Sequence, residues 1–174
     1  MTPRSALFCK RVVKQVPTDF VCIRQTGLTD CGAACLATIF QTYHQSYAQE
    51  TLRQLIPTDA AGASIQALIE AAQKCGFEAC GLRGELAALT QITLPCIAHF
   101  QDTPNNHFVV IHHYENGTLI VADPAQGLVE YSVAEFAQRW SGILITLQPQ
   151  GQQAITLRRI AKCLFSRLGH HRNR

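Results

Sequence analysis

Apolar residues recur at helical spacing through the first half of the chain. Three segments there have the pattern of helices with one apolar face: 31–44, 48–56 and 65–75. Thr29 or Asp30 is placed to cap the first helix, and Ser64 is placed to cap the third. Gly76 follows the third segment at the position where helices commonly end in a left-handed residue. The first half is therefore predicted to be helical.

Short runs rich in β-branched and aromatic residues dominate the second half. They predict strands over 77–83, 96–100, 107–114, 118–123 and 143–148. The segment 115–117 contains Asn-Gly and indicates a β-hairpin. Residues 85–89 have the pattern of a weak helical turn, and Ser132 with Glu135 has the spacing of a capping box, which begins a short helix stopped by Gly142. Because helices precede antiparallel strands, the predicted class is α+β, with N-terminal helices packed on an antiparallel sheet.

Length and composition fit one globular domain. The chain has 174 residues, of which 47% are hydrophobic and 16% are charged. We interpret 1–16 as a basic N-terminal extension and 17–149 as the domain. A Gln-rich linker and a basic C-terminal segment follow over 150–174.

Charge is unevenly distributed along the chain. Residues 1–14 carry a formal charge of +4, residues 15–157 carry −7 and residues 158–174 carry +6, for a net charge of +3. An acidic body argues against a nucleic-acid-binding core, which would carry a basic stripe on the fold itself. The basic ends could contact anionic lipid, RNA or an acidic partner, or could simply aid solubility.

The sequence shows no export signal and no membrane span. There is no run of about 18 apolar residues, and the N-terminal apolar run 6–9 is too short for a signal peptide. A cytoplasmic protein is therefore predicted. In that compartment we expect the eight cysteines to be free thiols, mostly buried as small hydrophobic residues.

Cys31 lies at the predicted start of the first helix. A helix N-terminus presents unpaired N–H groups and a partial positive charge, and both stabilise a thiolate. Gln25 lies six residues upstream and could turn its amide toward the same point to donate to an oxyanion. These two residues are candidates for a nucleophile and its oxyanion hole. The alternative is that Cys31 is simply a small buried residue.

His107 and Asp123 lie on the two strands of the predicted hairpin. A thiol nucleophile needs a base and a group that orients the base, and the chain order Cys, His, Asp fits a papain-like arrangement. A regular hairpin with the two-residue loop Asn116-Gly117 would place His107 and Asp123 on opposite faces of the sheet. A three-residue loop, or a bulge of equal effect, would make them diagonal neighbours on one face. Catalysis therefore predicts the second geometry.

The remaining histidines and cysteines are weaker candidates. His112 and His113 lie too far along the strand from His107 for shared chemistry, and we interpret them as edge or surface residues. His99 could line a cleft, but a structural role is the favoured interpretation. Cys35, one helical turn after the candidate nucleophile, is expected to be packed in the core. The cysteine spacings lack a pair of zinc knuckles and no GxxxxGK[ST] motif occurs, so we expect no metal and no cofactor.

Several segments, taken in order, resemble a known family. It is the double-glycine leader peptidase, the papain-like cysteine peptidase domain of bacterial ABC transporters that export bacteriocins and other peptides. The resemblance covers roughly residues 20–148. It rests on the segments IRQTGLTDCGAACLATIF, GASIQALIEAAQKCGFEACGL, LPCIAHF, NHFVVIHHYENGTLIVADPAQG and YSVAEFAQRWSGILITLQP. A papain-like cysteine peptidase fold is the fold that this resemblance implies.

The resemblance also implies a role for each candidate residue. Cys31 matches the nucleophile and His107 the general base and acid. Asp123 matches the residue that orients the histidine, and Gln25 matches the oxyanion-hole glutamine. The implied reaction is cleavage of a leader peptide after a Gly-Gly pair, with the leader bound as an amphipathic helix. The implied partners are that leader and the membrane and ATPase domains of a transporter.

This chain departs from the family in two places. Thr38 stands where a larger apolar residue is expected on the nucleophile helix, which predicts a minor change in packing. The chain ends at Arg174 without transmembrane helices or an ATPase domain, so we expect either an excised domain or a freestanding member. In the first case 158–174 would approach the inner face of the cytoplasmic membrane. In the second it could contact a surface or a partner.

Two other functions stay open. A non-catalytic docking module would bind a leader without cleaving it, although all the catalytic candidates are present here. A Cys-His-Asp acyltransferase would have the same chain order. Two features argue against an acyltransferase: the spacing from Gln25 to Cys31 and the Gly-Ala-Ser segment 62–64.

Overall fold

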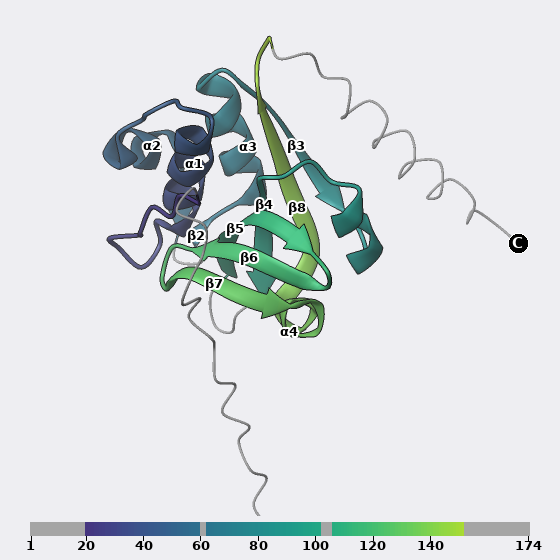
Figure 1. Cartoon of the computed structure of the whole chain (residues 1–174). Coiled ribbons are helices and arrows are strands. Elements are labelled where there is room, and N and C mark those ends of the chain that lie inside the picture. The colour runs from purple at the N-terminus through teal and green to yellow at the C-terminus, as the bar shows by residue number, and fades with distance from the viewer. Residues whose placement is uncertain (1–19, 60–61, 102–105, 152–174) are drawn as a thin grey trace, which may run out of the picture.

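The computed structural model describes residues 20–59, 62–101 and 106–151. In these ranges a six-stranded antiparallel sheet lies beside a group of helices (Figure 1). The helices of this group are α1 (Cys31–Thr42), α2 (Gln49–Leu55) and α3 (Ile65–Lys74). Helices packed on an antiparallel sheet are the α+β arrangement that the sequence predicts.

The sheet has the strand order β3-β8-β4-β5-β6-β7. Its strands are β3 (Phe77–Arg83), β4 (Cys96–Gln101), β5 (Asn106–Glu115), β6 (Thr118–Asp123), β7 (Gly127–Ser132) and β8 (Trp140–Pro149). Strands β4 to β7 follow one another as a meander, and β8 returns to lie between β3 and β4. Strand β5 is therefore internal, with β6 as its neighbour.

Strand β5 contributes to two hydrophobic cores. Phe108 and Val110 pack in the core that includes residues of α1 and α3. Val109 and Ile111 belong to a second core, which contains Phe136 of the short helix α4 (Val133–Arg139). Alternate side chains of a strand point to opposite faces, so β5 is buried on both. Helix α1 packs against β5.

The local helix signals in the sequence are confirmed. Ser64 caps α3, because its hydroxyl accepts the N–H of Ala67 at 3.1 Å. Gly76 follows that helix with a φ of 81°, as expected for a residue in the left-handed region. Ser132 and Glu135 make both bonds of a capping box at the start of α4.

Other local expectations are wrong. Asp30 is the N-cap residue of α1, but its side chain makes no capping bond to that helix. Helix α4 already ends at Arg139, and Gly142 lies inside β8, because Trp140 pairs with Phe100 of β4 instead of extending the helix.

Several short elements are absent from the sequence-based prediction. These are β1 (Thr58–Asp59), β2 (Gly62–Ala63) and the edge strand β7. The weak helical turn predicted over 85–89 is present as the 3₁₀ helix η1 (Leu86–Thr90). Strands of two residues have too few positions for a periodic pattern to be visible.

The predictions about the chain ends lie outside the described residues. These are the basic extension 1–16, the basic segment 158–174 and nearly all of the linker. The domain boundaries therefore remain predictions. Of the helices that the structure describes, none has the length and apolar character needed to cross a bilayer.

Candidate active site

Cys31 is the first residue of α1, as the sequence predicts. Its side chain is buried, with only 3% of its surface exposed. The first backbone bond at this end of the helix runs from the N–H of Ala34 to the carbonyl of Asp30 at 3.0 Å. The N–H groups of the residues between them point out of the helix end and give it a partial positive charge. The Cys31 sulfur therefore lies where negative charge is stabilised.

The hairpin between β5 and β6 combines a tight turn with a bulge. Asn116 and Gly117 form a two-residue turn in which both have positive φ, 51° and 79°. Farther along the pair, Ile111 faces Val121 although the turn alone would not align them. The extra residue is His112, which shifts the register by one position. The predicted bulge of equal effect is therefore confirmed.

This shifted register brings His107 and Asp123 together. Beyond the bulge Val110 faces Ala122, which makes His107 and Asp123 diagonal neighbours on one face of the sheet. His107 Nε2 lies 2.8 Å from Asp123 Oδ1. Without the bulge, the two side chains would point to opposite faces.

Asp123 is fully buried at the end of β6. Its carboxylate also accepts the N–H of Ala125 at 2.9 Å and the side-chain amide of Gln126. Burial alone would raise the pKa of Asp123, but these donors and the charge of His107 hold that pKa below its ordinary value. Asp123 is therefore a carboxylate at neutral pH.

His107 connects this carboxylate to Cys31. Burial disfavours the imidazolium, but hydrogen bonds to Asp123 and Cys31 and the charges of both raise the pKa of His107 to about 9. Because Nε2 faces Asp123, Nδ1 is the ring nitrogen that remains for the Cys31 sulfur. The three side chains thus form a continuous thiol, imidazole and carboxylate series, in which the histidine is charged at neutral pH.

Gln25 makes two hydrogen bonds near this group, one through its backbone and one through its side chain. Its backbone N–H donates to the carbonyl of Pro124, next to Asp123, at 3.0 Å. Its side-chain Nε2 donates to the carbonyl of Gly27 at 2.9 Å, which uses one of the two amide hydrogens. Within the described ranges, its Oε1 is a buried oxygen without a hydrogen-bond partner. The second amide hydrogen is not used by the bond to Gly27.

Sequence reasoning missed two residues that hold the turn after Asp123. Gln126 binds the carboxylate directly. Arg24 donates from Nε to the carbonyl of Pro124 at 3.1 Å and from Nη2 to that of Ala125 at 2.6 Å. Arg24 is a hundred residues away in sequence, so no local pattern links it to this turn.

The structure corrects the interpretation of His112. It is buried rather than at an edge or surface, and it is the extra residue of the bulge. Its Nε2 lies 2.7 Å from the carbonyl of Val21, and its ring stacks on Phe20 with 5.2 Å between centroids. His113 is exposed, as predicted. His99 is buried, with Nδ1 2.8 Å from Ser141 Oγ, which fits the structural role expected for it.

The six cysteines in the described part of the chain are free thiols, as predicted, while Cys9 and Cys163 lie outside it. Cys35 is fully buried, as expected for a packed residue. Within the described ranges, no three His, Cys, Asp or Glu side chains gather in a way that could hold a metal ion.

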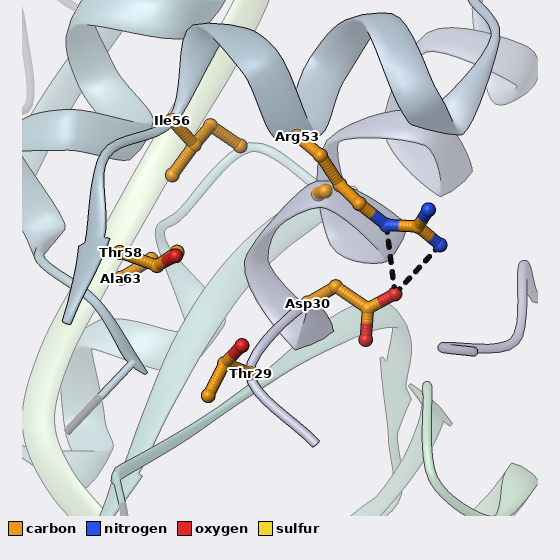
Figure 2. Close-up of a pocket in the computed structure, with 7 residues that line it drawn as sticks. Thr29, Asp30, Arg53, Ile56, Thr58 and Ala63 are labelled. Atoms are coloured by element: carbon orange, nitrogen blue, oxygen red, sulfur yellow. Dashed lines mark hydrogen bonds and ion pairs between the residues drawn. The ribbon is translucent and has the colours of Figure 1, made fainter. Parts of the chain in front are cut away.

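A small cavity lies beside the start of α1 (Figure 2). Its volume is about 70 Å³, and its lining comes from α1, the loop before it, and the segment from α2 to β2: Thr29, Asp30, Ala33, Arg53, Ile56, Thr58 and Ala63. Asp30 and Arg53 form an ion pair at its edge, with Arg53 Nη2 2.8 Å from Asp30 Oδ2.

The chain matches the peptidase C39 family over residues 19–152. This chain belongs to the peptidase C39 family. It is therefore a cysteine peptidase, and its sheet and helices have the papain-like fold of the solved C39 peptidase domains.

Known proteins similar to this C39 peptidase include processing and transport proteins and a protein named as a probable protease. The lactococcin-G-processing and transport ATP-binding protein LagD of Lactococcus lactis is 30% identical over 141 residues, which are 79% of this chain and 20% of LagD. The probable functional amyloid protease FapD of Pseudomonas aeruginosa is 33% identical over 129 residues, 70% of this chain and 57% of FapD. This C39 peptidase thus spans about a fifth of the length of the transporter it matches.

A solved structure has the same fold. It is the double glycine motif protease of an AMS/PCAT transporter in complex with the leader peptide. It is 31% identical to this C39 peptidase and superposes with a TM-score of 0.70, covering 75% of this chain and 91% of its own.

Proposed function

We propose that this C39 peptidase cleaves the leader peptide of a secreted peptide precursor after a Gly-Gly pair, in association with an ABC transporter that exports the product. The similar Lactococcus protein is named for both processing and transport, and the solved neighbour is a double glycine motif protease bound to a leader peptide. The observation that carries the proposal is the contact of His107 with buried Asp123, beside Cys31 at the start of α1.

In the first half of the reaction, the Cys31 thiolate attacks the carbonyl carbon of the second glycine. The tetrahedral intermediate carries its negative charge on the former carbonyl oxygen. The Cys31 N–H and the Gln25 amide would donate to that oxygen. The intermediate collapses as His107 gives its proton to the leaving amine, so that the C–N bond breaks and a thioester with Cys31 remains.

In the second half, His107 acts as a base toward water. Water attacks the thioester, its proton passes to the imidazole, and the leader leaves with a free carboxylate while the Cys31 thiolate re-forms. Asp123 keeps the Nε2–H of His107 bonded throughout, so that Nδ1 faces the reacting atoms.

The crowding around Cys31 supports glycine at the cleavage site. Cys31 is 3% exposed, so little of its surface is open to a substrate. A peptide without side chains at the two positions before the cleaved bond fits such a narrow approach best.

Cleavage of a synthetic precursor peptide with a Gly-Gly leader tests the proposal. Wild-type protein is expected to release the leader, and Cys31→Ala to release none, because the nucleophile is gone. Cys80→Ala is the matched control, since Cys80 is an exposed thiol on β3. The readout is mass spectrometry of the products. Turnover by Cys31→Ala at the wild-type rate, or cleavage at another peptide bond, would overturn the assignment.

We further propose that the peptidase works at the inner face of the cytoplasmic membrane. The similar Lactococcus protein is a transporter, and the basic segment 158–174 carries the charge that would suit an anionic lipid surface.

A further inference from the structure

The carboxylate of Asp30 closes the loop that leads into Cys31. Its side chain bends back instead of capping α1: Oδ1 accepts the N–H of Gly27 at 2.8 Å, and Oδ2 accepts the N–H of Thr26 at 3.2 Å. Oδ2 also accepts the hydroxyl of Thr26 at 3.1 Å. Burial would raise the pKa of Asp30, but these bonds and that of Arg53 lower it. An ionised, buried carboxylate is therefore the centre of this loop.

Arg53 of α2 holds that carboxylate from the other side (Figure 2). Its Nε and Nη2 lie 3.0 and 2.8 Å from the same oxygen, Asp30 Oδ2. Nη2 also bonds to the hydroxyl of Thr26, and Nη1 bonds to Glu50 at 2.7 Å. A planar guanidinium with several donors can make all these bonds at once, which a lysine cannot.

These contacts continue to Gln25. Arg53 binds Asp30, Asp30 binds the N–H of Gly27, and the carbonyl of Gly27 binds the Gln25 amide at 2.9 Å. The direction of the Gln25 amide therefore depends on the position of Gly27. That position in turn depends on the ion pair between α2 and the residue before the nucleophile.

We infer that Asp30 and Arg53 are positioning residues for the peptidase reaction, which hold the loop 25–30 so that the Gln25 amide faces the oxyanion beside Cys31. The inference rests on the proposed oxyanion role of Gln25. A displaced donor stabilises the transition state less but leaves contacts with the rest of the substrate intact. Loss of the ion pair therefore lowers kcat more than it raises KM.

The first test compares the kinetics of Arg53 variants on the Gly-Gly leader peptide. Arg53→Ala is expected to lower kcat by about 10- to 100-fold and to leave KM within about twofold of the wild-type value. The decrease in kcat should not exceed the decrease caused by removing an oxyanion donor altogether. Arg53→Lys is expected to recover part of kcat, since it restores one donor to Asp30. Arg83→Ala, at an exposed arginine on β3, is the matched control and keeps the wild-type rate. An unchanged kcat in Arg53→Ala overturns the inference.

The second test is a double-mutant cycle with Gln25→Ala. If Arg53 acts through Gln25, removing Arg53 as well leaves kcat at the value of Gln25→Ala alone. Multiplied losses in the double variant overturn the inference, because they indicate a general effect on the fold. Should Arg53→Ala lose its near-ultraviolet circular dichroism, the cycle is run with Arg53→Lys under the same criteria. Failure of the wild-type protein to cleave would instead contradict the proposed function itself.

Discussion

His107 is the residue whose chemistry depends most on its surroundings. In water an imidazole is largely neutral at pH 7. Here the buried carboxylate of Asp123 and the Cys31 sulfur raise its pKa to about 9. The proton that the leaving amine needs is therefore already on the enzyme at neutral pH.

The pH dependence of kcat/KM reports this shift. We expect kcat/KM to fall as the pH rises through about 9, because His107 then loses the proton it donates. Asp123→Asn removes the charge that raises the pKa of His107, so the alkaline limb moves to lower pH and the maximum rate falls. A pH–rate profile of each variant measures both effects. His113→Gln, at an exposed histidine of the same strand, is the control and keeps the wild-type profile. An alkaline limb at the same pH in Asp123→Asn would contradict this account.

Among the elements, β5 determines whether His107 and Asp123 lie on the same face of the sheet. Its bulge at His112 sets the register with β6, and residues before α1 hold the bulge in place. The carbonyl of Val21 binds His112, and Phe20 stacks on its ring. The chain entering the domain therefore supports a strand some ninety residues later.

Helix α1 is joined to the same entering segment through Thr38. Its buried hydroxyl accepts the N–H of Ile23 at 3.0 Å. The sequence suggested only a minor change in packing at this position. The structure instead shows a hydrogen bond that an apolar residue could not make, since the N–H of Ile23 would lose its acceptor.

Replacing Thr38 measures how much the bond between Thr38 and Ile23 contributes to the free energy of unfolding. Thr38→Val keeps the shape of the side chain but leaves the N–H of Ile23 without its acceptor, so we expect the free energy of unfolding to fall by about 1–3 kcal/mol. Thr42→Val is the matched control on the same helix, because the Thr42 hydroxyl donates to the carbonyl of Thr38 within α1. Urea unfolding of the three proteins gives the comparison. Equal losses in both variants would argue against the Ile23 bond.

At the scale of the whole molecule, the two basic ends of the chain are separate in sequence from the proposed site residues. The proposed site residues lie between 25 and 123, inside the acidic body of the chain, whereas the +6 segment 158–174 follows the domain. If the segment 158–174 binds an anionic surface as proposed, its removal is expected to change where the peptidase binds and to leave the reaction unchanged.

The proposed membrane role of the basic segment can be tested at three of its arginines, Arg158, Arg159 and Arg167. Replacing all three by glutamine is expected to weaken binding to vesicles containing phosphatidylserine, by roughly 1 kcal/mol for each charge near the surface. Cleavage of a soluble leader peptide should stay at the wild-type rate. Vesicles of phosphatidylcholine alone, and high salt, are the controls. Unchanged co-sedimentation with the anionic vesicles would contradict a role in membrane association.

Much of the site could be predicted from short-range patterns. Some features depend only on residues a few positions apart in the chain. These are the helix start at Cys31, the caps Ser64 and Ser132, and the Asn-Gly turn. The alternation of side chains along a hairpin allowed two geometries for His107 and Asp123, and the one with a bulge is found. The role of Asp30 was not visible, because capping and loop closure suit the same residue type at the same position.

The sequence by itself determined the helices α1 and α3 and the strands β5 and β6 that carry the site, and the order in which the thiol, imidazole and carboxylate follow along the chain. Local propensity and capping act over a few residues, so they can be read without the fold. Only the tertiary structure decided where the extra residue of β5 lies and which cation meets Asp30. Those outcomes depend on contacts between distant residues: His112 with Val21, and Arg53 with Asp30. No periodic pattern records such contacts, because they arise only when separate elements pack together.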